Sequence, residues 1–165
     1  MGFAGSDESN TMIRSPRTIA RVSIESGLVA GIAMMPFGAV LRALGYQVNV
    51  YGELMVRALL GSAPMLAQLV FHVVVSITLA IPFVLFARWR GGANHVSGAI
   101  YGVLSWAALN ATLLPLLFER STGWALGFEV IWPSLLVHVV YGMTLGAVTA
   151  RRMSRVRART EHRAS

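Results

Sequence analysis

Four apolar stretches without a charged side chain dominate the pattern of the chain. They run between Glu25 and Arg42, between Arg57 and Arg88, between Arg90 and Glu119, and between Glu129 and Arg151. About 20 apolar residues in a helix cross the hydrocarbon core of a bilayer. The pattern therefore predicts four membrane-spanning helices, the first of them over Ser23–Leu44 with its end charges at the two interfaces.

The composition supports a membrane protein. Of the 165 residues, 55% are hydrophobic and 13% are charged, whereas soluble domains carry about a quarter of charged residues. A chain of this length cannot bury so much apolar surface in water, and the surface helices of soluble proteins show a charged face. We therefore expect an all-α integral membrane four-helix bundle.

The arginines are distributed unevenly between the two sides that four spans define. Arg42, Arg57 and Arg120 lie on one side, and the other eleven of the 14 arginines lie on the opposite side. Positively charged residues are retained in the cytoplasm. The sequence thus predicts a protein of the cell inner (plasma) membrane with both termini in the cytoplasm.

Two tails flank the predicted four-helix domain of residues 22–152. Residues 1–21 lack the apolar region of a signal peptide, are rich in small and polar residues, and are expected to form a disordered cytoplasmic tail. Residues 153–165 form a basic cytoplasmic tail, which we interpret as an anchor beside anionic lipid headgroups. The lipid bilayer is the expected partner, and no nucleic acid is expected.

Two segments centred on a histidine match each other along the chain. LVFHVVVSITLA (69–80) and LLVHVVYGMTLG (135–146) share Leu, His, Val, Val, Thr and Leu at the same places. We interpret the match as one helical hairpin present twice, over about residues 22–90 and 94–152. Each copy contains two spans, so the copies form parallel repeats related by a pseudo-two-fold axis along the membrane normal.

Small or polar residues recur every four positions along these helices, and such residues share one helix face. The two stripes are Gln68, His72, Ser76 and Ala80, and Ser134, His138, Gly142 and Gly146. Small residues in lipid lie where helix backbones approach closely. We predict helix packing at three pairs of glycines: Gly27 and Gly31, Gly98 and Gly102, and Gly142 and Gly146.

His72 and His138 form the candidate intramembrane polar pair, expected on opposite sides of the central axis. Ionisable residues inside a membrane face protein or water, and three interpretations stay open. The histidines are neutral and fix the packing by hydrogen bonds, or they form a proton-responsive pair, since histidine titrates near neutrality. The third is a bis-histidine haem b site inside the bundle, although the chain has no CxxCH attachment motif.

Chemistry outside the histidines is sparse in this sequence. The chain has no cysteine, so no cysteine-ligated metal site is expected, and we predict no catalytic residue, no metal ligand and no cofactor besides the haem alternative. Glu25 is expected near the start of the first helix, where a carboxylate favours the helix dipole. Asn110 is expected to bond to a neighbouring helix, and VYGELMVRALL (50–60) to form a short amphipathic helix.

A family resemblance rests on Gly98, Tyr101-Gly102 and Trp106 in the third span, and His138, Tyr141-Gly142 and Gly146 in the fourth. Over about residues 22–150 the chain resembles small four-helix bacterial inner-membrane proteins of the YqhR or YagU kind. This resemblance implies a polytopic inner-membrane protein and brings no catalytic residue with it.

From these observations we expect a structural or interaction subunit without catalytic activity. It either self-associates or lies beside a larger membrane-protein partner. The alternative is a small transporter or proton-responsive protein that uses His72 and His138, and a haem protein is third.

Overall fold

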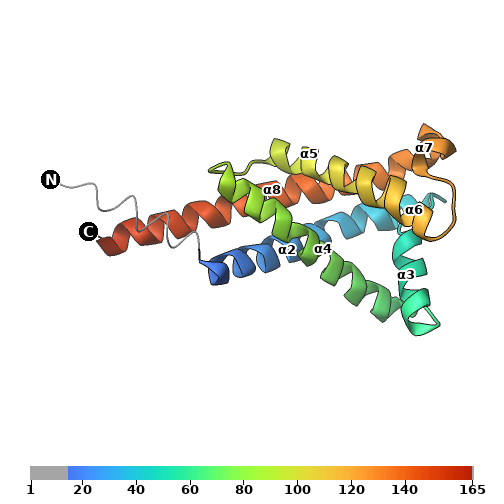
Figure 1. Cartoon of the computed structure of the whole chain (residues 1–165), viewed down its shortest axis with the longest axis horizontal. Helices are drawn as coiled ribbons and strands as arrows, with labels where there is room; N and C mark the ends of the chain where they lie inside the picture. The colour runs from blue at the N-terminus through green and yellow to red at the C-terminus, as the bar shows by residue number, and fades with distance from the viewer. Residues whose placement is uncertain (1–14, 165) are drawn as a thin grey trace.

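A computed structural model describes residues 15–164 of the chain, of which residues 160, 161, 163 and 164 are described by their backbone alone. Four long helical segments form the protein (Figure 1). They are α2 (Pro16–Ala43), α4 (Met65–Trp89), α5 (His95–Ser105) with its continuations η1 (Trp106–Leu113) and α6 (Leu114–Leu117), and α8 (Phe128–Ala164). All four are long and apolar enough to cross a membrane, which confirms the predicted all-helical chain with four such helices.

The first helix begins earlier than the sequence suggested. Ser15 is its N-cap, and the Ser15 hydroxyl accepts a hydrogen bond from the Thr18 backbone N–H at 3.2 Å. Pro16 occupies the first helical position, where a missing N–H costs nothing. Residues 16–21 therefore belong to α2 and not to the disordered tail predicted for residues 1–21, while residues 1–14 lie outside the described part.

The last helix continues past the predicted end of the membrane domain. α8 runs to Ala164, so the described part of the basic tail is a helical extension of the fourth span.

The third span starts at a capping box before α5. The Asn94 side chain accepts a hydrogen bond from the Ser97 N–H at 2.8 Å, and the Ser97 hydroxyl accepts one from the Asn94 N–H at 3.1 Å. Such reciprocal bonds satisfy two donors that a helix start leaves unpaired.

Two helices lie at the centre of the bundle and two at its margins. α2 packs extensively against both α4 and α8, and α5 packs against α8, whereas α4 and α5 have few close backbone approaches. In Figure 1, α4 diverges from the α5–η1–α6 segment toward the end of the bundle where α3 lies. The lateral order is therefore α4, α2, α8 and α5.

A short helix, α3 (Val50–Leu60), crosses that end of the bundle (Figure 1). Its bounds match the amphipathic helix predicted for residues 50–60, which is confirmed. Arg57 donates to the Glu53 carboxylate at 3.0 Å, one helical turn away. α7 (Gly123–Leu126) lies in the connection between α6 and α8.

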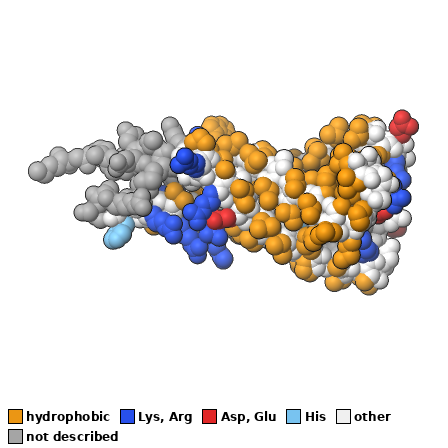
Figure 2. Space-filling model, turned by 90° about the horizontal axis from the view of Figure 1, so that it is seen from below, with side chains coloured by type: hydrophobic (Ala, Val, Ile, Leu, Met, Phe, Trp, Pro, Cys, Tyr) orange, Lys and Arg blue, Asp and Glu red, His pale blue; other side chains and the backbone are white. Residues whose placement is uncertain are grey.

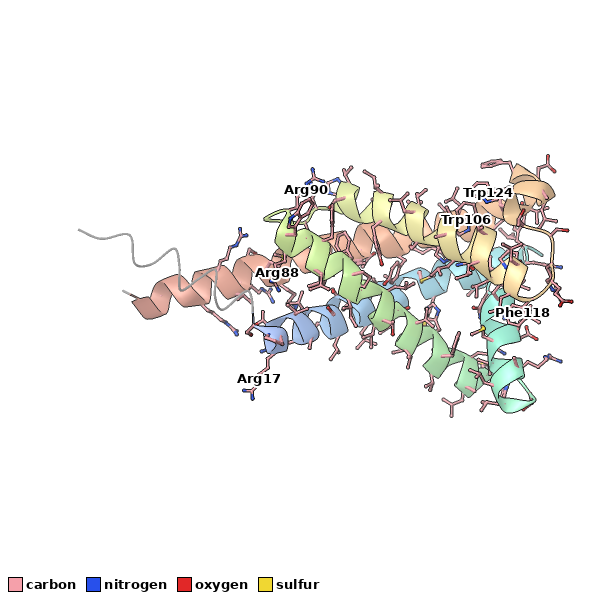
Figure 3. The ribbon with its side chains drawn as sticks, in the orientation of Figure 1. Arg17, Arg88, Arg90, Trp106, Phe118 and Trp124 are labelled. Carbon is pink, nitrogen blue, oxygen red and sulfur yellow. The ribbon has the colours of Figure 1, made fainter. Side chains whose placement is uncertain are left out.

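The surface divides into an apolar middle and two charged ends. Figure 2 shows hydrophobic side chains around the middle of the molecule and arginines concentrated toward the end where α2 begins and α8 extends. Arg17, Arg88 and Arg90 lie toward this end, and Trp106, Phe118 and Trp124 lie toward the other (Figure 3). The outward side chains of the spans are apolar, as Ile32, Val74 and Leu104 illustrate, which suits contact with lipid.

Glu25 has a different role from the one the sequence suggested. α2 begins at Pro16, so Glu25 lies well inside the helix and not at its dipole-bearing start. One carboxylate oxygen lies 3.0 Å from Nε of Arg21, and the other lies 3.0 Å from Nε of Arg152. The carboxylate thus joins α2 to α8.

Candidate intramembrane site

His72 of α4 bonds to the backbone of α2. Its Nε2 lies 3.1 Å from the carbonyl oxygen of Gly31. A carbonyl oxygen can only accept, so this contact places the imidazole proton on Nε2. A Cβ added at Gly31 would lie 2.7 Å from the Ser76 hydroxyl oxygen and 3.8 Å from Nε2 of His72, so glycine leaves room for the two helices to approach here.

His138 of α8 is held at both ring nitrogens. Nδ1 lies 2.7 Å from the carbonyl oxygen of Ser134 in the preceding turn, and Nε2 lies 3.1 Å from the side-chain nitrogen of Asn110. Nδ1 therefore donates, and Nε2 accepts a hydrogen bond from the amide. This arrangement is that of a neutral imidazole, and its tautomer is opposite to that of His72. It also confirms the expectation that Asn110 bonds to a neighbouring helix.

The hydrogen bonds around His138 continue along the third span. The indole N–H of Trp106 donates to the Ser134 hydroxyl at 3.2 Å. The indole N–H of Trp124 donates to the Thr112 hydroxyl at 3.0 Å, and the two indole rings meet edge to face with centroids 5.8 Å apart. Trp106 and Thr112 lie, with Asn110, in the π-helical segment η1. Such segments often occur at functional sites of proteins.

The two histidines have different hydrogen-bond partners. Each histidine bonds to groups other than the second histidine. If the hairpins are aligned by their Ser-Gly pairs, Asn110 corresponds to Ala39, whose side chain forms no hydrogen bond. His72 therefore lacks a counterpart to the Asn110 contact.

Two tyrosines that the sequence analysis did not single out for this region bind α4. The Tyr101 hydroxyl donates to the carbonyl oxygen of Leu79, and the Tyr141 hydroxyl donates to that of Ser76, each at 2.6 Å. The signal in the sequence is the residue type itself, since a buried tyrosine hydroxyl needs a partner.

The six predicted packing glycines are all buried. A Cβ on Gly27 would lie 2.7 Å from the Ile77 Cα of α4, and one on Gly98 would lie 2.8 Å from the Gly146 Cα of α8. Gly31 faces Ser76 as described above. A Cβ on Gly102 would lie 3.1 Å from the Gly142 Cα. The glycines of α2 thus face α4, and those of α5 face α8.

Two hydroxyls in the interior differ from these bonded groups. The side chains of Ser23 on α2 and Thr149 on α8 are buried, and neither hydroxyl has a hydrogen-bond partner. Among the side chains that the structure describes, no three histidine, aspartate or glutamate residues gather closely enough to hold a metal ion.

Comparison with known proteins gives one match. A family model described as "Family of unknown function (DUF6789)" matches residues 18–160. No curated protein and no solved structure matches the chain. The resemblance to proteins of the YqhR or YagU kind stays a prediction.

Proposed function

The chain belongs to DUF6789, a family of unknown function, and we propose that it is a structural or interaction subunit of the inner membrane without catalytic activity. The observation that carries the proposal is that each histidine bonds to a neighbouring helical segment, His72 to the Gly31 carbonyl oxygen of α2 and His138 to the Asn110 side chain of η1. Polar side chains with partners on neighbouring helices hold those helices together. Both imidazoles then serve to fix the packing of the bundle.

The proposed orientation places both termini in the cytoplasm. Four spans return the chain to the side on which it started, and the arginines gather at the end where α2 begins (Figures 2 and 3). Positively charged residues mark the cytoplasmic side of an inner-membrane protein. The α2–α3 turn and α7 then face the outside.

The proposed architecture is a duplicated hairpin. Its support is the matching register of the two glycine contacts: Gly27 and Gly31 meet α4 beside Ser76, and Gly98 and Gly102 meet α8 beside Gly142, the residue that corresponds to Ser76. The pseudo-two-fold relation is imperfect in this proposal, because α2 packs closely on α8 and α4 does not pack in the same way on α5.

The proposed partners are the bilayer and either a second copy or a larger membrane protein. α4 favours such a role, because between Met65 and Ala87 it carries no charged side chain and most of its surface is apolar. A helix of this kind presents the same apolar surface to lipid and to another transmembrane helix. No nucleic-acid partner is proposed.

The second candidate function is a proton-responsive membrane protein or small transporter, and the geometry of His138 supports it. A proton added to Nε2 would face the N–H groups of the Asn110 amide, so two donors would meet. The amide would have to rotate and present its oxygen. Protonation of His138 would thereby change the orientation of the Asn110 side chain.

A haem b protein is the third candidate, and the bonding of His138 argues against it. An imidazole ligand gives the lone pair of one ring nitrogen to the iron. In His138, Nδ1 donates to Ser134 and the lone pair of Nε2 accepts from Asn110, so iron would have to displace the amide. A visible absorption spectrum of the purified protein tests this candidate.

A flux assay separates the first two candidates. Proteoliposomes with a pH-sensitive dye inside are compared with empty liposomes at about pH 5.5 and about pH 7.5, on either side of the ordinary histidine pKa. A structural subunit gives no flux above that of empty liposomes at either pH. Flux that increases at the lower pH and disappears in the His138→Gln variant would replace the first proposal by the second.

A further inference from the structure

The arginines of the α8 extension fall into two groups. Arg152 pairs with Glu25 at 3.0 Å, and the Arg157 guanidinium donates to the carbonyl oxygen of Gly91 in the α4–α5 turn at 2.9 Å. Met153 is buried between them, and Val156 packs against the same core. These contacts hold the first turns of the extension against the bundle.

The second group consists of the arginines of the extension whose side chains point away from the bundle. Arg151, Arg155 and Arg159 are exposed, and their spacing of four residues places them along one side of the helix. Arg21 of α2 has 68% of its side chain exposed although it touches Glu25, and Arg90 is exposed at the end of α4. Several guanidinium groups thus face the surroundings of the protein.

Arg21, Arg90, Arg151 and Arg155 lie within a narrow range of depth, whereas Arg159 lies about 10 Å beyond the level of Arg152 on α8. A helix rises about 1.5 Å per residue, so Arg151 and Arg155 lie within about 5 Å of the level of Arg152, and Arg21 lies about 6 Å from that of Glu25. The Arg157–Gly91 contact brings the turn after Arg90 close to the same level. The headgroup layer on each side of a bilayer is about 5–8 Å thick, which matches this depth.

The charge at this level is almost entirely positive. Among the side chains that the structure describes, Glu25 is the carboxylate at the arginine-rich end, and it is already shared by Arg21 and Arg152. The apolar surface begins directly beside the arginines (Figure 2), where Ile24 is 50% exposed and Trp89 is 83% exposed. A ligand that fits this place carries a negative group next to an apolar chain.

We propose that Arg21, Arg90, Arg151 and Arg155 form an arginine collar that binds the phosphate groups of acidic phospholipids, such as phosphatidylglycerol. Guanidinium groups bind phosphate oxygens by paired, charge-assisted hydrogen bonds. The lipid's acyl chains lie along the apolar surface below. The collar rests on the membrane placement of the proposed function and is independent of the role of the histidines.

The test is a titration of short-chain phosphatidylglycerol into the full-length protein in a neutral detergent. The thermal unfolding midpoint is measured at each lipid concentration, and short-chain phosphatidylcholine, which has no net charge, is the comparison. Phosphatidylglycerol is expected to raise the midpoint in a saturable, salt-sensitive way. An arginine near an anionic surface contributes a factor of about five in affinity. The Arg151→Gln/Arg155→Gln variant is therefore expected to bind about 25-fold more weakly.

Two further variants separate charge from packing. Arg151→Lys/Arg155→Lys keeps both charges and should retain most of the affinity, whereas Arg120→Gln, at the opposite end of the bundle, should leave the titration unchanged. Equal midpoints in the two lipids, or an equal loss in Arg120→Gln, would overturn the collar.

Glu25 gives a test with the opposite sign. Glu25→Gln releases Arg21 and Arg152 from their shared carboxylate, so phosphatidylglycerol should bind several-fold more tightly, even if the lipid-free protein is less stable. Unchanged or weaker binding would contradict the collar.

A short RNA homopolymer tests the alternative ligand. If the RNA raises the midpoint as much as the lipid does, and the Arg151→Gln/Arg155→Gln variant loses that increase as well, the surface binds nucleic acid instead. None of these outcomes depends on whether the histidines conduct protons, so the two proposals fail separately.

Discussion

The side-chain nitrogen of Asn110 lies 3.1 Å from Nε2 of His138, which joins the π-helical segment of the third span to the middle of the fourth. The matching histidine of the first hairpin, His72, bonds to the Gly31 carbonyl oxygen instead. The contact with the neighbouring helical segment is thus made to a side chain in the case of His138 and to a backbone carbonyl oxygen in the case of His72. A side-chain partner can be removed by substitution, and a backbone partner cannot.

The Asn110–His138 contact predicts strong coupling between these two residues. Asn110→Leu and His138→Leu should each lower the free energy of unfolding by about 1–3 kcal/mol, because each leaves a polar partner unsatisfied. The double variant should cost clearly less than the sum, since no orphaned group remains. Thermal unfolding in detergent measures the cycle.

His72→Leu combined with Asn110→Leu is the matched control for that cycle. The two side chains share no hydrogen bond, so their effects should add within about 0.5 kcal/mol. Additivity of Asn110→Leu with His138→Leu as well would mean that the contact contributes nothing to stability.

The spans could be predicted from the sequence because lipid imposes a simple rule on them. A long apolar segment has to be helical where water is absent, and the chain contains four such segments, the first of which reaches the length of a span only with its end charges at the interfaces. The packing faces follow from the same physics, since glycines spaced by four residues allow close approach of backbones. The ends of the helices were harder to predict than their middles. α2 begins at Pro16 because Ser15 caps it, but in the sequence this serine cannot be distinguished from the other polar residues of the N-terminal tail.

The partners of the polar side chains could not be predicted from the pattern. The depth of His138 in the membrane follows from counting residues, but its bond to Asn110 depends on the rotation of the third span, which the π-helical segment changes locally. Glu25 and Arg152 lie far apart in the sequence, and their contact depends on α8 remaining helical beyond the membrane. Tertiary geometry decides both contacts.

The glycine contact between α5 and α8 predicts an unequal response to two small substitutions. A Cβ at Gly142 would meet the Gly98 carbonyl oxygen and lie 2.9 Å from the Gly102 Cα. Gly142→Ala should therefore push the helices apart, at a cost of about 1–3 kcal/mol. Unfolding in detergent and the helical content before unfolding are the measurements.

Gly38→Ala is the control for this substitution. Gly38 also lies within a span, in α2, but a Cβ there meets nothing within 4 Å. The change should be neutral or stabilise by about 0.4–1 kcal/mol, because alanine has less freedom in the unfolded chain. Equal losses at Gly38 and Gly142 would show that the contact of Gly142 with α5 does not set the effect.

The ion pair between α2 and α8 should contribute more than the pair within α2. Glu25 and Arg152 are partly buried, with 27% and 35% of their side chains exposed, so solvent screens this contact less than one at the surface. We expect Arg152→Gln to cost about 1 kcal/mol and Arg21→Gln about 0.3–0.5 kcal/mol, the usual range of an exposed pair one turn apart. Chemical unfolding at low and high salt measures both, and a larger loss in Arg21→Gln would contradict the assignment.

The proposed orientation predicts opposite locations for the two ends of the bundle. Asn49 lies in the turn between α2 and α3, at the end away from the arginines, and Gly92 lies in the α4–α5 turn beside Arg90. Fusions of alkaline phosphatase, which is active outside the cytoplasm, and of green fluorescent protein, which fluoresces inside it, are made at Asn49, at Gly92 and after the last residue. The phosphatase should be active at Asn49 alone, and fluorescence should appear at Gly92 and at the C-terminus. If Asn49 and Gly92 report the same side, α4 does not cross the membrane and the four-span topology is wrong. If all three signals are reversed, the four spans stand, and the arginine collar must then lie in the outer leaflet.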